Sequence, residues 1–318
     1  MSVWRPIKQP RAGFLNDLSN SIADLENMVP NVLSAHDKSC MWLASDYSGQ
    51  HKDAPFEAYS FLVTTEGSLA GWDRKRQAFR DRYLPDGRRL SFKAARESVR
   101  WRALKPFLRL ANGLQGNLFI FVVDSQFQSL FRDSGKTTWS DIPKIFPRGT
   151  STHVVEQTLR IGMFISLIIA GLRDEKQKAI WISDQDEALE AYDRRERLGV
   201  FVSYMTWGMT GWKNPATMEF GTTALDSPDR RFEDLAAIPD LAAGAMAHFA
   251  PAVPIPPVPG EGVQVIKREM CADPRTRLIL DWLGMDKGTL RRILLRVVKD
   301  ETGAMRARAE CIRNLLVL

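Results

Sequence analysis

Short apolar runs recur along the chain and end in polar residues, which is the pattern of strands buried in a sheet. The clearest runs are rich in β-branched and aromatic residues, and they predict strands over 41–46, 59–65, 118–124 and 179–183. Further segments predict strands over 89–93, 200–207 and 217–222. Apolar and polar residues alternate in 89–93, as they do in a half-buried strand.

The segments between these runs predict helices, over 71–83, 94–112, 151–172, 187–197 and 235–249. Pro106 should kink or restart the second of them. The most apolar stretch, 161–172, is too short to cross a bilayer, which takes about 20 residues. We therefore expect a buried core helix there and no membrane partner.

The mixed order of strands and helices predicts an α/β protein in four parts. Residues 1–38 form a leader, residues 39–250 the main domain, and the proline-rich residues 251–260 an extended linker. Residues 261–318 should form a small helical tail, because apolar residues recur at helical spacing over 275–284, 289–298 and 304–318.

Composition narrows the class of protein. The chain has 318 residues, of which 44% are apolar and 26% charged, an ordinary globular balance. Its net charge of +6 favours polyanionic partners without requiring them. Cys40, Cys271 and Cys311 are far apart and lack metal-ligand spacing, and the first residues lack the apolar core of a signal peptide. These features predict a reduced, cytoplasmic protein.

Aspartates stand where predicted strands end or a predicted helix begins, and they are the main candidates for chemistry. Asp46, Asp124 and Asp184 each close a strand, and Asp240 opens an alanine-rich helix. Carboxylates that converge at one edge of a sheet need a cation, usually Mg²⁺ or Mn²⁺, and such sites serve phosphoryl transfer. Each aspartate could equally be a turn or helix-cap residue.

Several of these segments resemble one family. Asp46-Tyr47-Ser48-Gly49 resembles the Asp-x-Ser-Gly that opens the domain of unknown function 3800 family. Phe92-Lys93 resembles its strand-three lysine, Asp184 its strand-five aspartate, and the segment 238–244 its closing helix. The resemblance covers roughly residues 40–250. It implies an RNase H-like mixed five-stranded sheet flanked by helices, followed here by the small helical C-terminal unit.

The resemblance also implies a divalent-metal phosphodiesterase site. Asp46 would anchor Mg²⁺ or Mn²⁺ from the central strand, and Asp240 would approach from the closing helix. Asp124 and Asp184 compete for the remaining ligand position: the RNase H-like order favours the strand-four carboxylate, Asp124, and the family pattern favours Asp184. Lys93 would contact a phosphate oxygen or orient a carboxylate, although a solvated lysine is the alternative.

Three departures from the family pattern favour a different reading. Tyr47 stands where the family often has Glu, Pro239 stands where it often has Ala, and a glutamine near the closing aspartate is absent. These departures and the extra tail are compatible with a module that binds and does not cut.

Two further motifs carry alternatives. Arg102, Lys105 and Arg109 would fall within a narrow arc of one helix, where they could follow a phosphate backbone or form a solvated face. Gly135-Lys136-Thr137 resembles a phosphate loop, but it lacks the preceding glycine and the adjoining strand and helix.

The sequence therefore predicts a metal-dependent nuclease that hydrolyses phosphodiester bonds of DNA or RNA, in a setting such as bacterial defence or a mobile element. The alternative is a non-catalytic RNase H-like module that binds a protein partner or a second copy of itself.

Overall fold

The computed structural model of the chain describes residues 2–7, 13–51, 54–125, 127, 146, 150–184, 192–215, 217–226, 228–253, 264–267, 270–285, 287–299 and 305–313. Two features singled out in the sequence lie outside these residues. They are the phosphate-loop candidate at 135–137 and most of the proline-rich linker.

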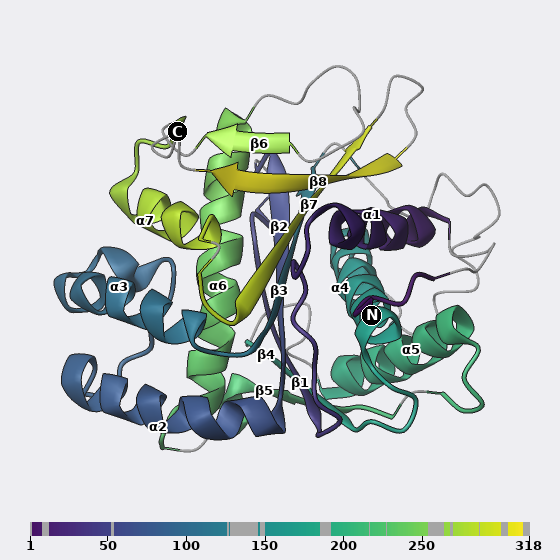
Figure 1. Cartoon of the computed structure of the whole chain (residues 1–318), viewed down its shortest axis with the longest axis horizontal. Helices are drawn as coiled ribbons and strands as arrows, with labels where there is room; N and C mark the ends of the chain where they lie inside the picture. The colour runs from purple at the N-terminus through teal and green to yellow at the C-terminus, as the bar shows by residue number, and fades with distance from the viewer. Residues whose placement is uncertain are drawn as a thin grey trace.

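The described residues form one mixed sheet of eight strands, in the order β5-β4-β1-β2-β3-β7-β8-β6 (Figure 1). The strands are β1 (Met41–Ser48), β2 (Phe56–Thr65), β3 (Gly116–Asp124), β4 (Ala179–Ser183), β5 (Glu219–Thr222), β6 (Gln264–Lys267), β7 (Leu290–Lys299) and β8 (Met305–Arg313). β2 is antiparallel to both β1 and β3, and β8 is antiparallel to β7. The remaining neighbours are parallel.

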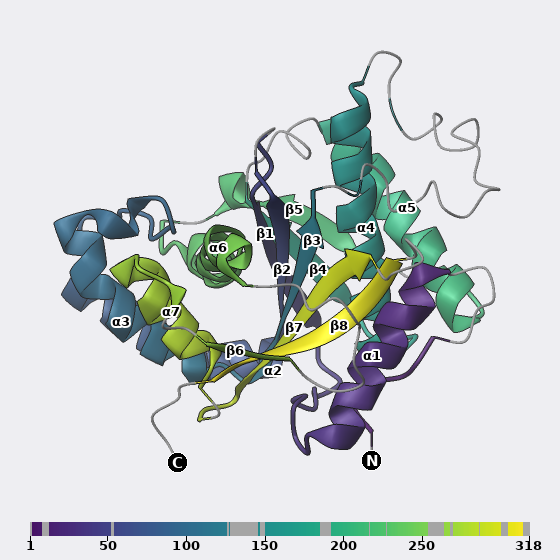
Figure 2. The ribbon, with the colours of Figure 1, turned by 90° about the horizontal axis from the view of Figure 1, so that it is seen from above.

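Helices cover both faces of the sheet, which makes three layers (Figure 2). One face carries α6 (Arg231–Phe249), with α2 (Glu66–Tyr83), α3 (Ser98–Asn112) and α7 (Pro274–Leu283) beside it. The other face carries α1 (Phe14–Met28), α4 (Thr152–Leu172) and α5 (Tyr192–Thr210). Single 3₁₀ turns are η2 (Ala94–Arg96), η4 (Thr223–Leu225) and η5 (Ala250–Ala252).

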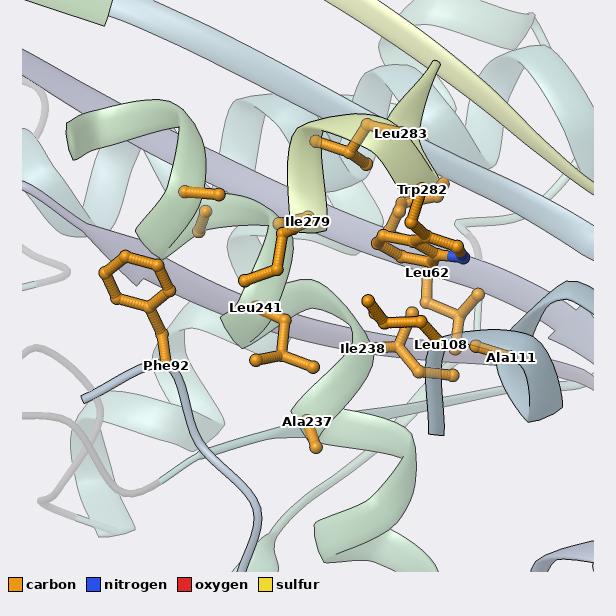
Figure 3. Packing of buried hydrophobic residues seen from close by; sticks show 14 of the residues in the cluster. Leu62, Phe92, Leu108, Ala111, Ala237, Ile238, Leu241, Ile279, Trp282 and Leu283 are labelled. Atoms are coloured by element: carbon orange, nitrogen blue, oxygen red, sulfur yellow. The ribbon is translucent and has the colours of Figure 1, made fainter. Parts of the chain in front are cut away.

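Two apolar cores follow from this layering, because successive side chains of a strand point to opposite faces. Trp42 and Ala44 of β1 pack in the core beneath α6, whereas Met41 and Leu43 pack in the core beneath α4. Figure 3 shows the first core, where side chains of α3, α6 and α7 meet above β2.

The apolar stretch expected as a core helix is α4. It is the one helix in the described part of the chain that is long and apolar enough to cross a membrane, but 94% of its apolar window is buried inside the fold. Ser151 caps its first turn by accepting a hydrogen bond from the backbone N–H of Val154 at 3.3 Å. The expectation of a buried core helix is therefore confirmed, as in a soluble protein.

Two strand predictions are wrong. Residues 200–207 belong to α5, where Leu198, Val202 and Met209 are buried at helical spacing. Residues 89–93 form a loop, although Leu90 and Phe92 are buried as the alternation suggested. The loop packs against α6, and its backbone forms hydrogen bonds with the side chains of Asp240 and Arg100 and with the N–H of Ala95, so it needs no neighbouring strand.

The expected five-stranded sheet and the small helical tail also need correction. The first predicted tail helix is present as α7 (Pro274–Leu283), but the described residues of the other two form the strands β7 (Leu290–Lys299) and β8 (Met305–Arg313), which extend the sheet beyond β3. The interior of β7 is buried on both faces, so its apolar residues form a nearly continuous run. Such a run does not distinguish a strand from a helix by periodicity.

Candidate functional site

A cavity of about 750 Å³ opens at the end of the sheet where β1 and β4 finish. Asp46, Asp184, Asp240 and Lys93 all line it, so four of the five predicted site residues face one space. They come from a strand end, a second strand end, helix α6 and the 89–93 loop. The structure thus brings together side chains that are spread over almost two hundred positions of the sequence.

Asp46 reaches the cavity because it continues the face of β1 that meets α6. It lies two residues past Ala44, which packs in the core beneath that helix. The chain then turns sharply at Gly49, whose φ is +82° and where a Cβ would lie 2.1 Å from the carbonyl oxygen of Phe56. Only glycine fits this turn. The Asp-Tyr-Ser-Gly motif therefore encodes both a cavity carboxylate and the turn behind it.

Asp184 lies beside Asp46 because of the strand register. Ser45 pairs with Ser183 in the parallel β1–β4 ladder, so Asp46 of β1 and Asp184, the first residue after β4, lie at the same level of the sheet. Neighbouring strands are about 5 Å apart. The Asp184 carboxylate accepts hydrogen bonds of 2.6 Å from Arg89 and from the hydroxyl of Thr223.

Asp240 enters from the middle of α6, two turns after the helix begins. Its carboxylate accepts a hydrogen bond from the backbone N–H of Phe92. Burial raises the pKa of the Asp240 carboxyl to about 7, the Phe92 hydrogen bond opposes the shift, and the negative charge of Asp184 adds to it. Asp240 and Asp184 are therefore close enough to repel one another.

Asp124 is the one predicted aspartate that does not line the cavity. The pairing of β1 with β2 and of β2 with β3 puts Ile120 level with Asp46. Asp124 is four residues farther along β3, about 13 Å beyond that level. Its charge acts instead on Arg296 of β7, whose pKa is lowered by burial and raised by Glu310 and Asp124.

Arg89 is a cavity residue that the sequence did not single out. Its guanidinium bonds Asp184 and lies 3.3 Å from the carboxylate of Glu233, which also lines the cavity. The loop 89–93 therefore brings two cations, Arg89 and Lys93, to the cavity wall. Because this segment looked like a strand, its role as a cationic loop was not apparent.

The loop is fixed in place by Phe92, whose ring packs against α6 at Gly244 (Figure 3). A Cβ on Gly244 would lie 2.3 Å from a ring carbon of Phe92. On the other side Arg275 of α7 lies 3.6 Å from the ring centre and donates a hydrogen bond to the Phe92 carbonyl. The C-terminal segment thus buttresses the loop that bonds Asp240.

One stripe of α6 forms a wall of the cavity: Glu233, Ala237, Asp240, Gly244 and His248 follow one another at three- and four-residue spacing. Glu233 and His248 were not predicted as site residues. Glu233 lies two turns before Asp240 on the same face, so helical spacing counted from Asp240 would have found it. His51, in the loop that follows β1, also lines the cavity.

Carboxylate oxygens are the donors that Mg²⁺ and Mn²⁺ prefer, so the cavity offers suitable chemistry for a divalent cation. The raised pKa of Asp240 beside Asp184 also marks a place where added positive charge would be stabilising. However, among the described residues no three His, Cys, Asp or Glu side chains are close enough to hold a metal ion together. A cation shared by these aspartates would compete with Arg89 for the Asp184 carboxylate.

The fold and cavity define an α/β protein with a carboxylate-lined pocket at the carboxyl ends of adjacent parallel strands. Comparisons with known proteins found no matching family model, no matching curated protein and no matching solved structure.

Proposed function

We propose that this protein is a divalent-metal-dependent nuclease that hydrolyses phosphodiester bonds of DNA or RNA. The observation that carries the proposal is the meeting of Asp46, Asp184 and Asp240, from three separate elements, around one cavity. Two cations, Arg89 and Lys93, line the same space and suit a phosphate ligand. A cytoplasmic setting, in bacterial defence or a mobile element, belongs to the same proposal.

An RNase H-like fold and membership of the domain of unknown function 3800 family are part of this proposal. Support comes from five strands in the order β3-β2-β1-β4-β5, with β2 antiparallel to its neighbours. Because residues 89–93 are not a strand, the fourth strand of the chain is β4, which Asp184 follows. In the RNase H-like order the third ligand follows the fourth strand. Asp184 therefore takes the place that was expected for Asp124 from the sequence, in agreement with the family pattern.

Each cavity residue has a role in the proposed reaction. Asp46, Asp184 and Asp240 would hold Mg²⁺ or Mn²⁺, which when bound supplies an activated water and charge stabilisation. The Phe92 N–H orients the Asp240 carboxylate, and Lys93 neutralises a phosphate oxygen of the substrate. Arg89, once released from Asp184, can donate two hydrogen bonds to two phosphate oxygens in bidentate fashion.

The matched pair Asp184→Asn and Asp124→Asn tests the site directly. Both variants remove one carboxylate charge at a strand end, but only Asp184 lines the cavity. With Mn²⁺ and a mixture of labelled single- and double-stranded DNA and RNA, wild-type protein should cut. Asp184→Asn should lose at least about 100-fold in rate, and Asp124→Asn should stay within a few-fold of wild type.

Asp46→Asn should abolish cutting and leave the thermal unfolding temperature near that of wild type. Mn²⁺ binding measured by calorimetry should weaken in parallel. Cutting that survives Asp46→Asn would show that the activity resides elsewhere, and equal losses in Asp184→Asn and Asp124→Asn would remove the assignment of Asp184.

The Arg89–Asp184 ion pair favours a second candidate function, a non-catalytic module that binds a protein partner or a second copy of the chain. In that case Arg89 is a permanent counter-ion, which agrees with the lack of a three-ligand group among the described residues. Arg89→Met distinguishes the two functions. It should tighten Mn²⁺ binding if a metal competes with Arg89, and no variant should bind Mn²⁺ if the cavity is purely a binding surface.

A further inference from the structure

Helix α3 carries an exposed, wholly cationic face next to the cavity. Its side chains Arg102, Lys105 and Arg109 are exposed to solvent. At about 100° per residue these three positions span roughly 60° of the helix circumference. We call this face the α3 ridge. The sequence suggested such a face, and the proposed cleavage chemistry makes no use of it.

The charges of the α3 ridge are not neutralised within the described part of the chain. No ion pair to a carboxylate involves Arg102, Lys105 or Arg109 there, and the Arg102 guanidinium donates only to the backbone carbonyl of Ser98, at 3.3 Å. Like charges three and four residues apart on a helix repel each other. A polyanionic ligand would relieve the repulsion among these three positive charges most effectively.

Trp101 adds an aromatic surface to the same side of α3. Its side chain is 40% exposed, which is unusual for so large an apolar group. It lies about 40° from Lys105 around the helix, so the indole and the cations share one arc of about 100°. An exposed indole among cations suits unpaired bases, which can stack on it while phosphates contact the cations. An acidic membrane surface has no flat rings to stack, and an acidic protein does not alternate rings with anionic groups as a single strand does, where each phosphate has its base.

The α3 ridge begins at the cavity wall. Lys93 lines the cavity, η2 follows it, and α3 starts two residues after η2 ends. The guanidinium of Arg100 donates a 2.6 Å hydrogen bond to the carbonyl of Arg89, which holds the first turn of α3 against the cavity loop. From there α3 runs to Asn112, whose carbonyl accepts a 2.9 Å hydrogen bond from the N–H of Thr289 just before β7 begins.

We propose that the α3 ridge is a docking surface for single-stranded nucleic acid, with bases stacked on Trp101 and phosphates on Arg102, Lys105 and Arg109. This inference rests on the proposed function for its choice of polyanion and extends it by naming the strand type and the path. The strand approaches the cavity along α3 and enters past Arg96 and Lys93, which are both exposed.

Fluorescence anisotropy with a labelled oligothymidine of about 20 nucleotides tests the ridge, in EDTA so that no cutting occurs. The triple variant R102Q/K105Q/R109Q should bind at least about tenfold more weakly. Its plot of log affinity against log salt should be shallower by about 2, because each phosphate contact to a single strand contributes roughly 0.7. Trp101→Ala should weaken binding about tenfold and leave the salt slope unchanged.

The matched control is K176Q/K178Q/K213Q, which removes the same charge from exposed positions beyond the ridge, in the loops before β4 and after α5. It should leave affinity and salt slope at wild-type values. Far-ultraviolet circular dichroism and thermal unfolding should be unchanged in all variants, since every substituted side chain is exposed.

An unchanged salt slope in the ridge variant overturns the proposal, and so does oligothymidine binding that responds equally to the control variant. Tighter binding to a duplex of the same length, or to phosphatidylserine vesicles only, also overturns it. The proposed function fails separately, if wild-type protein neither binds Mn²⁺ nor cuts. Binding that depends on the ridge, without cutting, would support the docking surface and contradict the nuclease function.

Discussion

Asp240 has an environment far from that of an ordinary surface carboxylate. The sequence predicted it as a metal ligand on a helix, and the fold half-buries it within electrostatic reach of Asp184 and gives it the Phe92 N–H. Its carboxyl therefore takes up a proton near pH 7 in the folded protein and near pH 4 in the unfolded chain. Between about pH 4 and pH 7 the folded state therefore binds one more proton than the unfolded chain does.

The stability of the protein should reflect this proton. A raised carboxyl pKa contributes stability that is present at low pH and is lost as pH rises through about 7. Asp240→Asn stays neutral at every pH, so without metal its free energy of unfolding should exceed that of wild type at pH 8.5 by up to about 4 kcal/mol. The difference should shrink toward pH 5.

Urea unfolding at pH 5 and pH 8.5, in EDTA, measures the effect of Asp240→Asn. Asp24→Asn, at an exposed position of α1, controls for the loss of one negative charge. A stability difference that is the same at both pH values would contradict the raised pKa.

At the scale of elements, the loop 89–93 depends on close packing between α6 and α7. Phe92 fits because position 244 has no side chain and because Arg275 covers the ring. Gly244→Ala should therefore push Phe92 outward and destabilise the protein by about 1–3 kcal/mol, the usual cost of overpacking. Mn²⁺ binding should weaken as well, since the Phe92 N–H would leave Asp240.

Gly199→Ala is the matched control for Gly244→Ala. Gly199 also lies inside a helix, α5, but nothing lies within 4 Å of the position that its Cβ would take. Alanine there should stabilise the protein by up to about 1 kcal/mol through helix propensity alone. Chemical unfolding of both variants separates propensity from packing, and equal effects would mean that Phe92 is not tightly held.

At the scale of the whole molecule, the C-terminal segment is part of the sheet and supports the loop that lines the cavity. β7 pairs with β3 from Gly116 to Val123, and α7 supplies Arg275. A chain shortened to residues 1–253 would expose the edge of β3 and the apolar faces beneath α7. We expect it to be insoluble or unfolded, whereas a chain ending at residue 313 keeps every described element and should fold.

Size-exclusion chromatography and circular dichroism distinguish these outcomes for the two shortened chains. A monomeric, folded 1–253 chain would instead support the independent tail that the sequence suggested. It would also mean that the Arg275 contact with Phe92 is dispensable for the fold.

The sequence by itself determined the strands of the central sheet, the buried helix α4 and the position of Asp184 just after a strand, whereas Asp46, expected at a strand end, lies two residues before the end of β1. Apolar runs, turn glycines and strand ends are local signals. They predict the folded structure because buried strands and tight turns require these residue types at these positions. Only the tertiary structure decided that 89–93 is a cationic loop, that β7 and β8 are strands, and that Asp124 lies away from the cavity. Those outcomes depend on strand register and on which distant surfaces meet, and local sequence carries neither.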